Sequence, residues 1–139
     1  MIDSAEEFIT LTESENLNDQ HRARHENAPE KVWFEVLEKY PEYVRSVIWN
    51  KTVPLSILHF LSTSPDTSVR YDLAMKRKLD ESLFEMLSKD PDDSVRHRIA
   101  CNKKTPKHII ERLASDNVAY VAETAIKSCS HIHGPRKTI

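Results

Sequence analysis

Residues 90–113 of the chain read DPDDSVRHRIACNKKTPKHIIERL, and their pattern recurs upstream and downstream at a fixed spacing. It has the pattern of a short helix, a turn and a second helix, followed by the start of another copy. The copies are aligned by residues spaced 26 apart: Tyr43, Val69, Val95 and Val121. A helix pair this small cannot bury its apolar stripe alone, but stacked neighbours can. The chain is therefore expected to be a series of one repeated unit.

The apolar positions of the unit are fixed relative to its first residue. In the copy that begins at Val95 they fall at 0, +4 and +5 on the first helix and at +14, +15 and +18 on the second. Asp66 and Asp92, or Ser68 and Ser94, are placed to accept hydrogen bonds from the free amides that start the first helices. A looser copy begins at Pro29.

The composition excludes several other classes of fold and site. The chain has a single glycine, Gly134, which argues against β-hairpins, a P-loop and a dinucleotide-binding fingerprint. Two cysteines form no disulfide framework. The first residues, MIDSAEEF, do not have the pattern of a signal peptide, and no apolar run reaches membrane-spanning length. We expect a cytoplasmic protein with no membrane partner.

These patterns predict an all-α protein, a right-handed α-solenoid (superhelix) of about four to five helix-pair repeats with an N-terminal helical cap. We expect one domain over residues 1–139, with the cap at 1–28, the repeats at 29–127 and a flexible tail at 128–139. Ser4 and Glu7 form a capping-box pattern, which predicts a helix over about residues 5–13.

Charge is unevenly distributed along the chain. Residues 1–43 hold 11 acidic and 4 basic residues, whereas residues 69–112 hold 11 basic and 8 acidic ones. The register places several cations in the turns between the two helices of a unit and so along one edge of the stack: Lys51, Lys76, Arg77, Lys78, Lys103 and Lys104. Such an edge can bind phosphates or an acidic protein surface, or it can serve only to keep the stack soluble.

Three further residues are candidates for partner binding. Trp49 lies one position past the apolar pair of its helix, at the rim of the stripe. His97 and Arg98 lie on a face of a first helix that the core stripe does not use. Tryptophan and arginine are typical anchors of protein interfaces.

Other charged and metal-binding patterns favour structural explanations. Arg70 and Arg96 are expected to pair with Asp66 or Asp92 of stacked repeats in a ladder of exposed ion pairs. His21 and His25 have the spacing of a helical metal pair but are better explained as surface histidines. The tail cluster of Cys129, His131 and His133 is better explained as part of a flexible terminus. We expect no metal, no cofactor and no catalytic residue.

The repeated pattern V-R-x-x-I-A-x-N-x-x-T-P-x-x-I-I-x-x-L-A-x-D resembles the leucine-rich repeat variant, a bacterial two-helix unit similar in shape to HEAT repeats. The resemblance implies a non-catalytic protein-binding module, and small bacterial solenoids of this kind include immunity-type proteins that neutralise toxins. Some relatives carry an N-terminal iron–sulfur cluster, but this chain has no cysteine before Cys101.

Two alternatives use the basic edge for nucleic acid. The first is non-catalytic binding. The second is a HEAT-like DNA glycosylase with Trp49 and Asp72 at its site, which is disfavoured because Asp72 aligns with Ser46 and Arg98 and so resembles surface variation.

Overall fold

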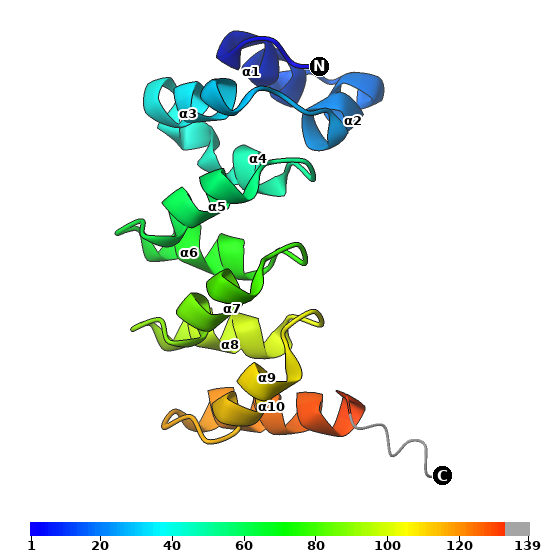
Figure 1. Cartoon of the computed structure of the whole chain (residues 1–139). Helices are drawn as coiled ribbons and strands as arrows, with labels where there is room; N and C mark the ends of the chain where they lie inside the picture. The colour runs from blue at the N-terminus through cyan, green and yellow to red at the C-terminus, as the bar shows by residue number, and fades with distance from the viewer. Residues whose placement is uncertain (133–139) are drawn as a thin grey trace. The chain divides into compact units, whose positions relative to one another are not determined.

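The computed structural model describes residues 1–132, with side chains up to Cys129, and within this range the chain is helical with no strand. The prediction of an all-α protein is confirmed (Figure 1). The helices are α1 (Ala5–Glu13), α2 (Leu17–His25), α3 (Glu30–Lys39), the 3₁₀ helix η1 (Pro41–Tyr43), α4 (Val44–Trp49), α5 (Leu55–Ser62), α6 (Thr67–Ala74), α7 (Glu81–Ser88), α8 (Asp93–Cys101), α9 (Lys107–Leu113) and α10 (Ala119–Ile132). Helix α10 thus extends into the segment predicted as a tail.

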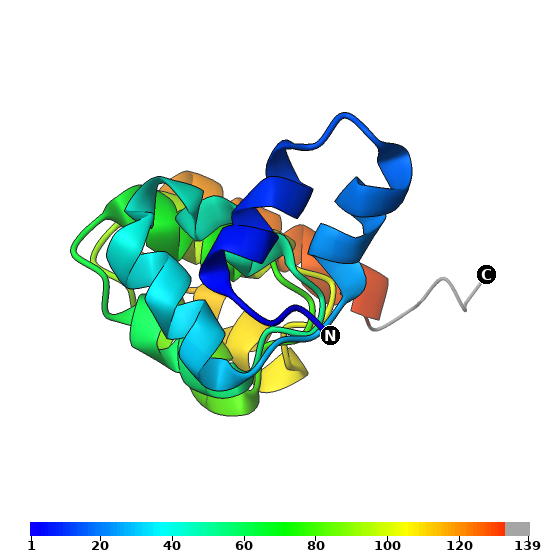
Figure 2. The ribbon, with the colours of Figure 1, turned by 90° about the horizontal axis from the view of Figure 1, so that it is seen from above.

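The chain divides into two compact units, unit 1 (Met1–Leu61) and unit 2 (Ser62–Ile139). In unit 1, α1 packs against α2 and α3, and α4 packs against α2 and α3. The ring of Phe8 meets the fully buried Trp33 ring edge to face, with 5.1 Å between centroids. The amino terminus lies beside the turn after α2, where Ile2 N–H donates to Asn27 O and the terminal ammonium pairs with Glu26 (Figure 2).

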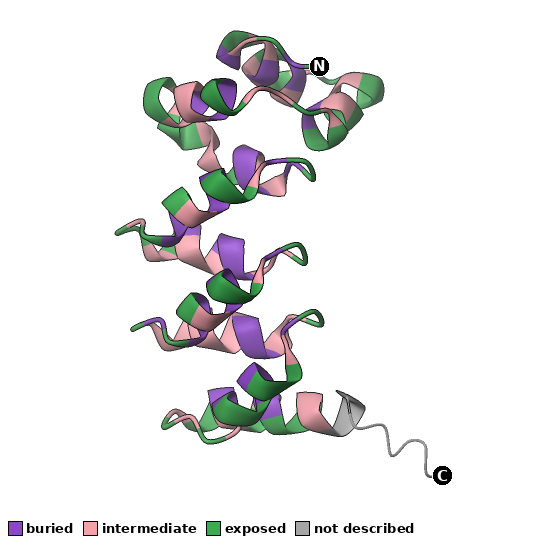
Figure 3. Cartoon of the chain, in the orientation of Figure 1, coloured by how far each residue is buried: buried purple, intermediate pink, exposed green. Residues whose placement is uncertain are grey.

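In unit 2 the helices pack in two rows. Helix α6 packs against α8 and α8 against α10, whereas α7 packs against α9. The predicted apolar positions are buried in the two complete pairs: Val69, Leu73, Ala74, Leu83, Phe84 and Leu87, then Val95, Ile99, Ala100, Ile109, Ile110 and Leu113. Each helix also keeps an exposed side (Figure 3). In α10, Ile126 occupies the position that corresponds to Ala74 in α6 and Ala100 in α8. Unlike those two buried residues it is 53% exposed, and the described residues include no later helix to cover it.

Helices α1, α6 and α8 begin with capped amides. Asp66 and Asp92 each accept from the backbone N–H two residues later, as predicted, and Ser4 accepts from Glu7 N–H at the start of α1. Thr105 is buried, and its hydroxyl donates to Ile99 O at 2.7 Å, which closes the turn between α8 and α9.

The arginine ladder exists, but its predicted partners are wrong. Arg70 pairs with Asp90 and Arg96 with Asp116, each with a 2.8 Å bond from Nε. Asp66 and Asp92 are engaged as helix caps, so the arginines reach the aspartates that follow the second helices. These pairs are also far less exposed than expected, with side-chain exposures of 13% or less.

Candidate partner-binding surfaces

The turns between paired helices are held against one another by an asparagine. In unit 2, Asn102 Nδ2 donates to Ala74 O at 2.9 Å and to Lys76 O at 2.7 Å, and its Oδ1 accepts from Lys104 N–H. The turns around residues 76–79 and 102–106 therefore lie together on one side of the unit (Figure 1). In unit 1, Asn50 repeats this arrangement with Ala23 O and Glu26 O.

The two joined turns of unit 2 carry exposed cations, as the register predicts. These are Arg77, Lys78, Lys103 and Lys104, none of which forms an ion pair with a described residue. Lys76 is half-buried beside them. By contrast, Lys89 at the end of α7 and Arg112 on α9 both pair with Glu85. The two turns of unit 2 thus carry four exposed cations that form no ion pair with a described residue, and these four residues are called the basic edge below.

Lys127 extends this surface, and sequence reasoning missed it. It is exposed on α10 and lines a pocket of about 440 Å³ together with Lys103 and Cys101. The 26-residue spacing could have identified it. Lys127 is 26 residues after Cys101 and 78 after Trp49, so it occupies the same position of the pattern as Trp49, which is a binding candidate.

His97 and Arg98 lie on α8 and are half-buried by neighbouring side chains of unit 2. His97 Nε2 is 3.1 Å from Thr124 Oγ1, and its ring packs on Tyr120 at 4.8 Å. Burial, with a smaller effect from the Arg98 guanidinium, lowers the pKa of His97, which favours a neutral ring at pH 7. Arg98 extends over the Tyr71 ring, with Cζ 5.6 Å from its centroid. Both residues therefore already contribute to packing within the unit.

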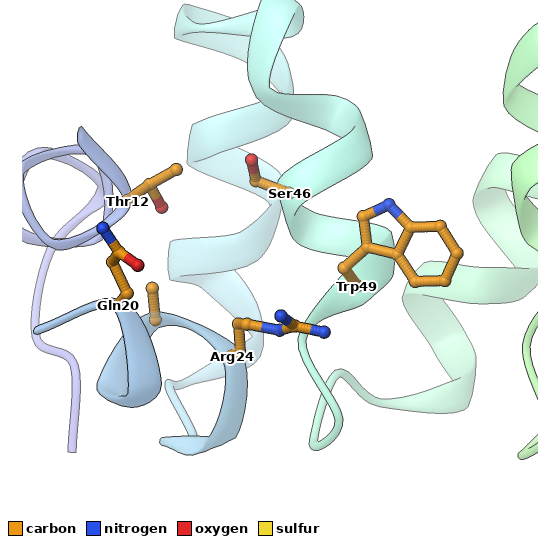
Figure 4. A pocket seen from close by; sticks show the side chains of 6 residues that line it. Thr12, Gln20, Arg24, Ser46 and Trp49 are labelled. Atoms are coloured by element: carbon orange, nitrogen blue, oxygen red, sulfur yellow. The ribbon is translucent and has the colours of Figure 1, made fainter. Parts of the chain in front are cut away.

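Trp49 and Lys51 belong to unit 1. Trp49 is the last residue of α4, and Lys51 lies in the turn that follows. Lys51 is exposed, and its N–H donates to Arg24 O at 2.7 Å. Trp49 is half-buried and forms one wall of a pocket of about 440 Å³ (Figure 4). The residues that line this pocket are Thr12, Gln20, Ala23, Arg24, Ser46 and Trp49.

Sequence reasoning identified only Trp49 among the lining residues of that pocket. The others come from α1, α2 and α4, and no fixed spacing links them. Asp72, considered as a glycosylase residue, is 9% exposed on α6, so its description as surface variation is wrong.

The described residues contain no group of three or more His, Cys, Asp or Glu arranged to hold a metal ion. His21 and His25 are exposed and stack their rings at 4.0 Å. The side chains of His131 and His133 lie outside the described residues. None of the described helices is both long enough and apolar enough to span a membrane. Comparison with protein-family models, with curated proteins and with solved structures gives no match.

Proposed function

We propose that the chain is an α-solenoid of helix-pair repeats that binds an acidic protein without catalysis, through the basic edge. The observation that carries the proposal is the lack of ion pairs at Arg77, Lys78, Lys103 and Lys104. The turn itself is held by the Asn102 side chain and backbone groups, so these four cations are not needed to close it. Exposed cations of this kind guide association with a surface of opposite charge.

The solenoid arrangement is supported by hydrogen bonds that recur in register. The Arg70–Asp90 and Arg96–Asp116 pairs have the same 20-residue separation, and their arginines are 26 residues apart. Asn50 and Asn102 each bond to carbonyls 24 to 28 residues earlier. A repeat whose side chains bond to the preceding repeat is the expected chemistry of a stacked array.

The test is capture of partners from the native host at low ionic strength by the wild-type chain and two variants. The first variant changes the basic edge to glutamine: Arg77, Lys78, Lys103 and Lys104. The matched control removes four exposed cations elsewhere: Lys31, Lys39, Lys89 and Lys107. We expect the first variant to lose a captured protein that the control retains, with an affinity at least about tenfold weaker. Equal capture by both variants would contradict the proposal.

The sharpest form of the proposal is an immunity-type protein that neutralises a bacterial toxin. It predicts that the captured partner arrests growth when it is expressed alone and that co-expression of this chain restores growth. Restoration should fail with the basic-edge variant. A captured partner that has no effect on growth would exclude this form while leaving protein binding in place.

Nucleic-acid binding uses the same cations and is the second candidate. Displacing counterions from duplex DNA with four cations gives a slope of log K against log salt of about −3 to −4. A gel-shift series measures this slope directly. Absence of binding at low salt, or binding that changes little with salt, excludes nucleic acid as the partner.

A further inference from the structure

We propose that the pocket beside Trp49 in unit 1 binds an acidic side chain of the partner protein, an inference that rests on the proposed function. The pocket is open, has a volume of about 440 Å³ and is formed by α1, α2 and α4 (Figure 4). Thr12 and Gln20 lie at one end, and Arg24 and Trp49 lie at the other. It is a separate feature from the basic edge of unit 2.

The charge of the pocket differs from that of the unit that contains it. Residues 1–61 include 11 acidic and 6 basic residues. None of the six lining residues is acidic, and Arg24 is exposed and forms no ion pair with a described residue. The acidic residues that follow Thr12 and Arg24 most closely in the sequence are engaged elsewhere: Glu13 with the Tyr43 hydroxyl and Glu26 with Arg22. The exposed Lys51, whose N–H bonds to Arg24 O, adds a second cation beside the pocket.

The polar groups of the pocket include donors without acceptors. The Arg24 guanidinium and the Ser46 hydroxyl have no hydrogen-bond partner among the described residues. Thr12 Oγ1 is buried without a partner and becomes available if the side chain rotates about its Cα–Cβ bond. A carboxylate only accepts hydrogen bonds, and the planar guanidinium fork matches its two oxygens. The donors therefore fit a carboxylate.

The walls favour a carboxylate carried on an aliphatic stem. Trp49 lines the same end of the pocket as Arg24, and Ala23 supplies a small apolar surface. The methylene groups of a glutamate side chain can pack on such a wall while its carboxylate reaches Arg24. A nucleic-acid backbone would bring many phosphates towards a unit with excess negative charge, which would repel them. A single carboxylate would interact mainly with the cations at the pocket.

The probe is N-acetylated, C-amidated hexaglutamate, titrated into the full ¹⁵N-labelled chain. The two tryptophan indole N–H resonances report separately, because Trp33 is fully buried and Trp49 lines the pocket. We expect the Trp49 resonance to shift saturably while the Trp33 resonance stays in place. Arg24→Gln should weaken binding about tenfold or more. Lys31→Gln removes the same charge from an exposed α3 position outside the pocket and should leave the affinity unchanged.

Three outcomes of the titration would overturn the inference. They are a Trp49 resonance that does not shift saturably, equal weakening by Arg24→Gln and Lys31→Gln, and an equal shift with sodium acetate or inorganic phosphate at the same anion concentration. The last result would identify a site for small anions. In the capture assay, a result in which Arg24→Gln binds the partner as the wild type does while the basic-edge variant does not bind it would contradict the pocket inference. That result would leave the proposed function unaffected.

Discussion

Removal of Arg96 tests how much the buried arginine ladder contributes to unit 2. Arg96 donates from Nε to Asp116 Oδ2 at 2.8 Å, from a second nitrogen to Asp116 Oδ1 at 3.2 Å, and from a third to Asp90 O at 2.8 Å. Arg96→Met keeps the aliphatic stem and leaves Asp116, whose side chain is only 8% exposed, without its cation. Breaking a buried pair in this way costs about 3–5 kcal/mol. Because some solvent reaches both side chains, we expect a loss of about 3 kcal/mol in the free energy of unfolding.

The measurement is guanidinium unfolding followed by circular dichroism. An unchanged slope of the unfolding free energy against denaturant concentration would indicate that the native state is intact. The control is Lys89→Met, which breaks an exposed pair with Glu85 and should cost about 0–0.5 kcal/mol. The double variant Arg96→Met with Asp116→Asn removes the orphaned charge and should recover at least about 1 kcal/mol. A loss below about 0.5 kcal/mol for Arg96→Met alone would mean that the Arg96–Asp116 pair contributes little to stability, contrary to this prediction.

The same pair has a defined pH dependence. Burial on its own would raise the pKa of Asp116, but hydrogen bonds from Arg96 and from Val118 N–H outweigh it and lower the pKa below the ordinary 3.8. A lowered pKa stabilises the folded state above the unfolded value and loses that contribution as pH falls. The contribution of Asp116 to wild-type stability should therefore be complete above about pH 4 and be lost as pH falls below it, whereas Arg96→Met, in which the bonds from Arg96 no longer outweigh burial, should not show this loss.

Three further results are expected. Asn102→Ala should destabilise unit 2 by about 2 kcal/mol in the same denaturation assay, because two carbonyls and one N–H lose their partner. The Glu13 carboxylate raises the pKa of Tyr43 to about 12, so Glu13→Gln should return tyrosinate absorbance towards pH 10. Arg22 and then the terminal ammonium lower the pKa of Glu26 to about 2, so its carboxyl carbon should titrate near pH 2 by NMR, and its contribution to stability should be lost between about pH 4.5 and pH 2. A Tyr43 pKa unchanged by Glu13→Gln, or a Glu26 midpoint near 4.5, would contradict these assignments.

The helices and the apolar positions could be predicted from the sequence because both follow from local spacing. A stripe such as Val95, Ile99 and Ala100 depends on the helical period alone, and the 26-residue register copies it along the chain. The basic edge followed from the same register. The arginine partners could not be predicted, because several aspartates lie near each repeat valine and only the path of the chain brings Asp90 to Arg70.

The pocket beside Trp49 also could not be predicted from the sequence, because the path of the chain brings its residues together. Its donors come from three helices, and Arg24 lies in a segment predicted to be only a cap. The bond from Asn50 Nδ2 to Ala23 O parallels the bond from Asn102 Nδ2 to Ala74 O, although the sequence of α2 hardly resembles that of α6. The two helices accept equivalent bonds without sharing a sequence pattern that would reveal the equivalence.

The distribution of charge across the repeat also separates structural cations from candidate binding cations. Arg70 and Arg96 are half-buried, pair with aspartates and bond to backbone carbonyls, so the fold explains them. Arg77 and Lys103 occupy one register position in successive turns, where Asn102 already satisfies the backbone and the cations meet no described carboxylate. Folding alone would tolerate any polar residue at that position, because the side chain there is exposed. A cation repeated at such a position is best explained by what approaches the turns from outside, and this is why the basic edge carries the proposed function.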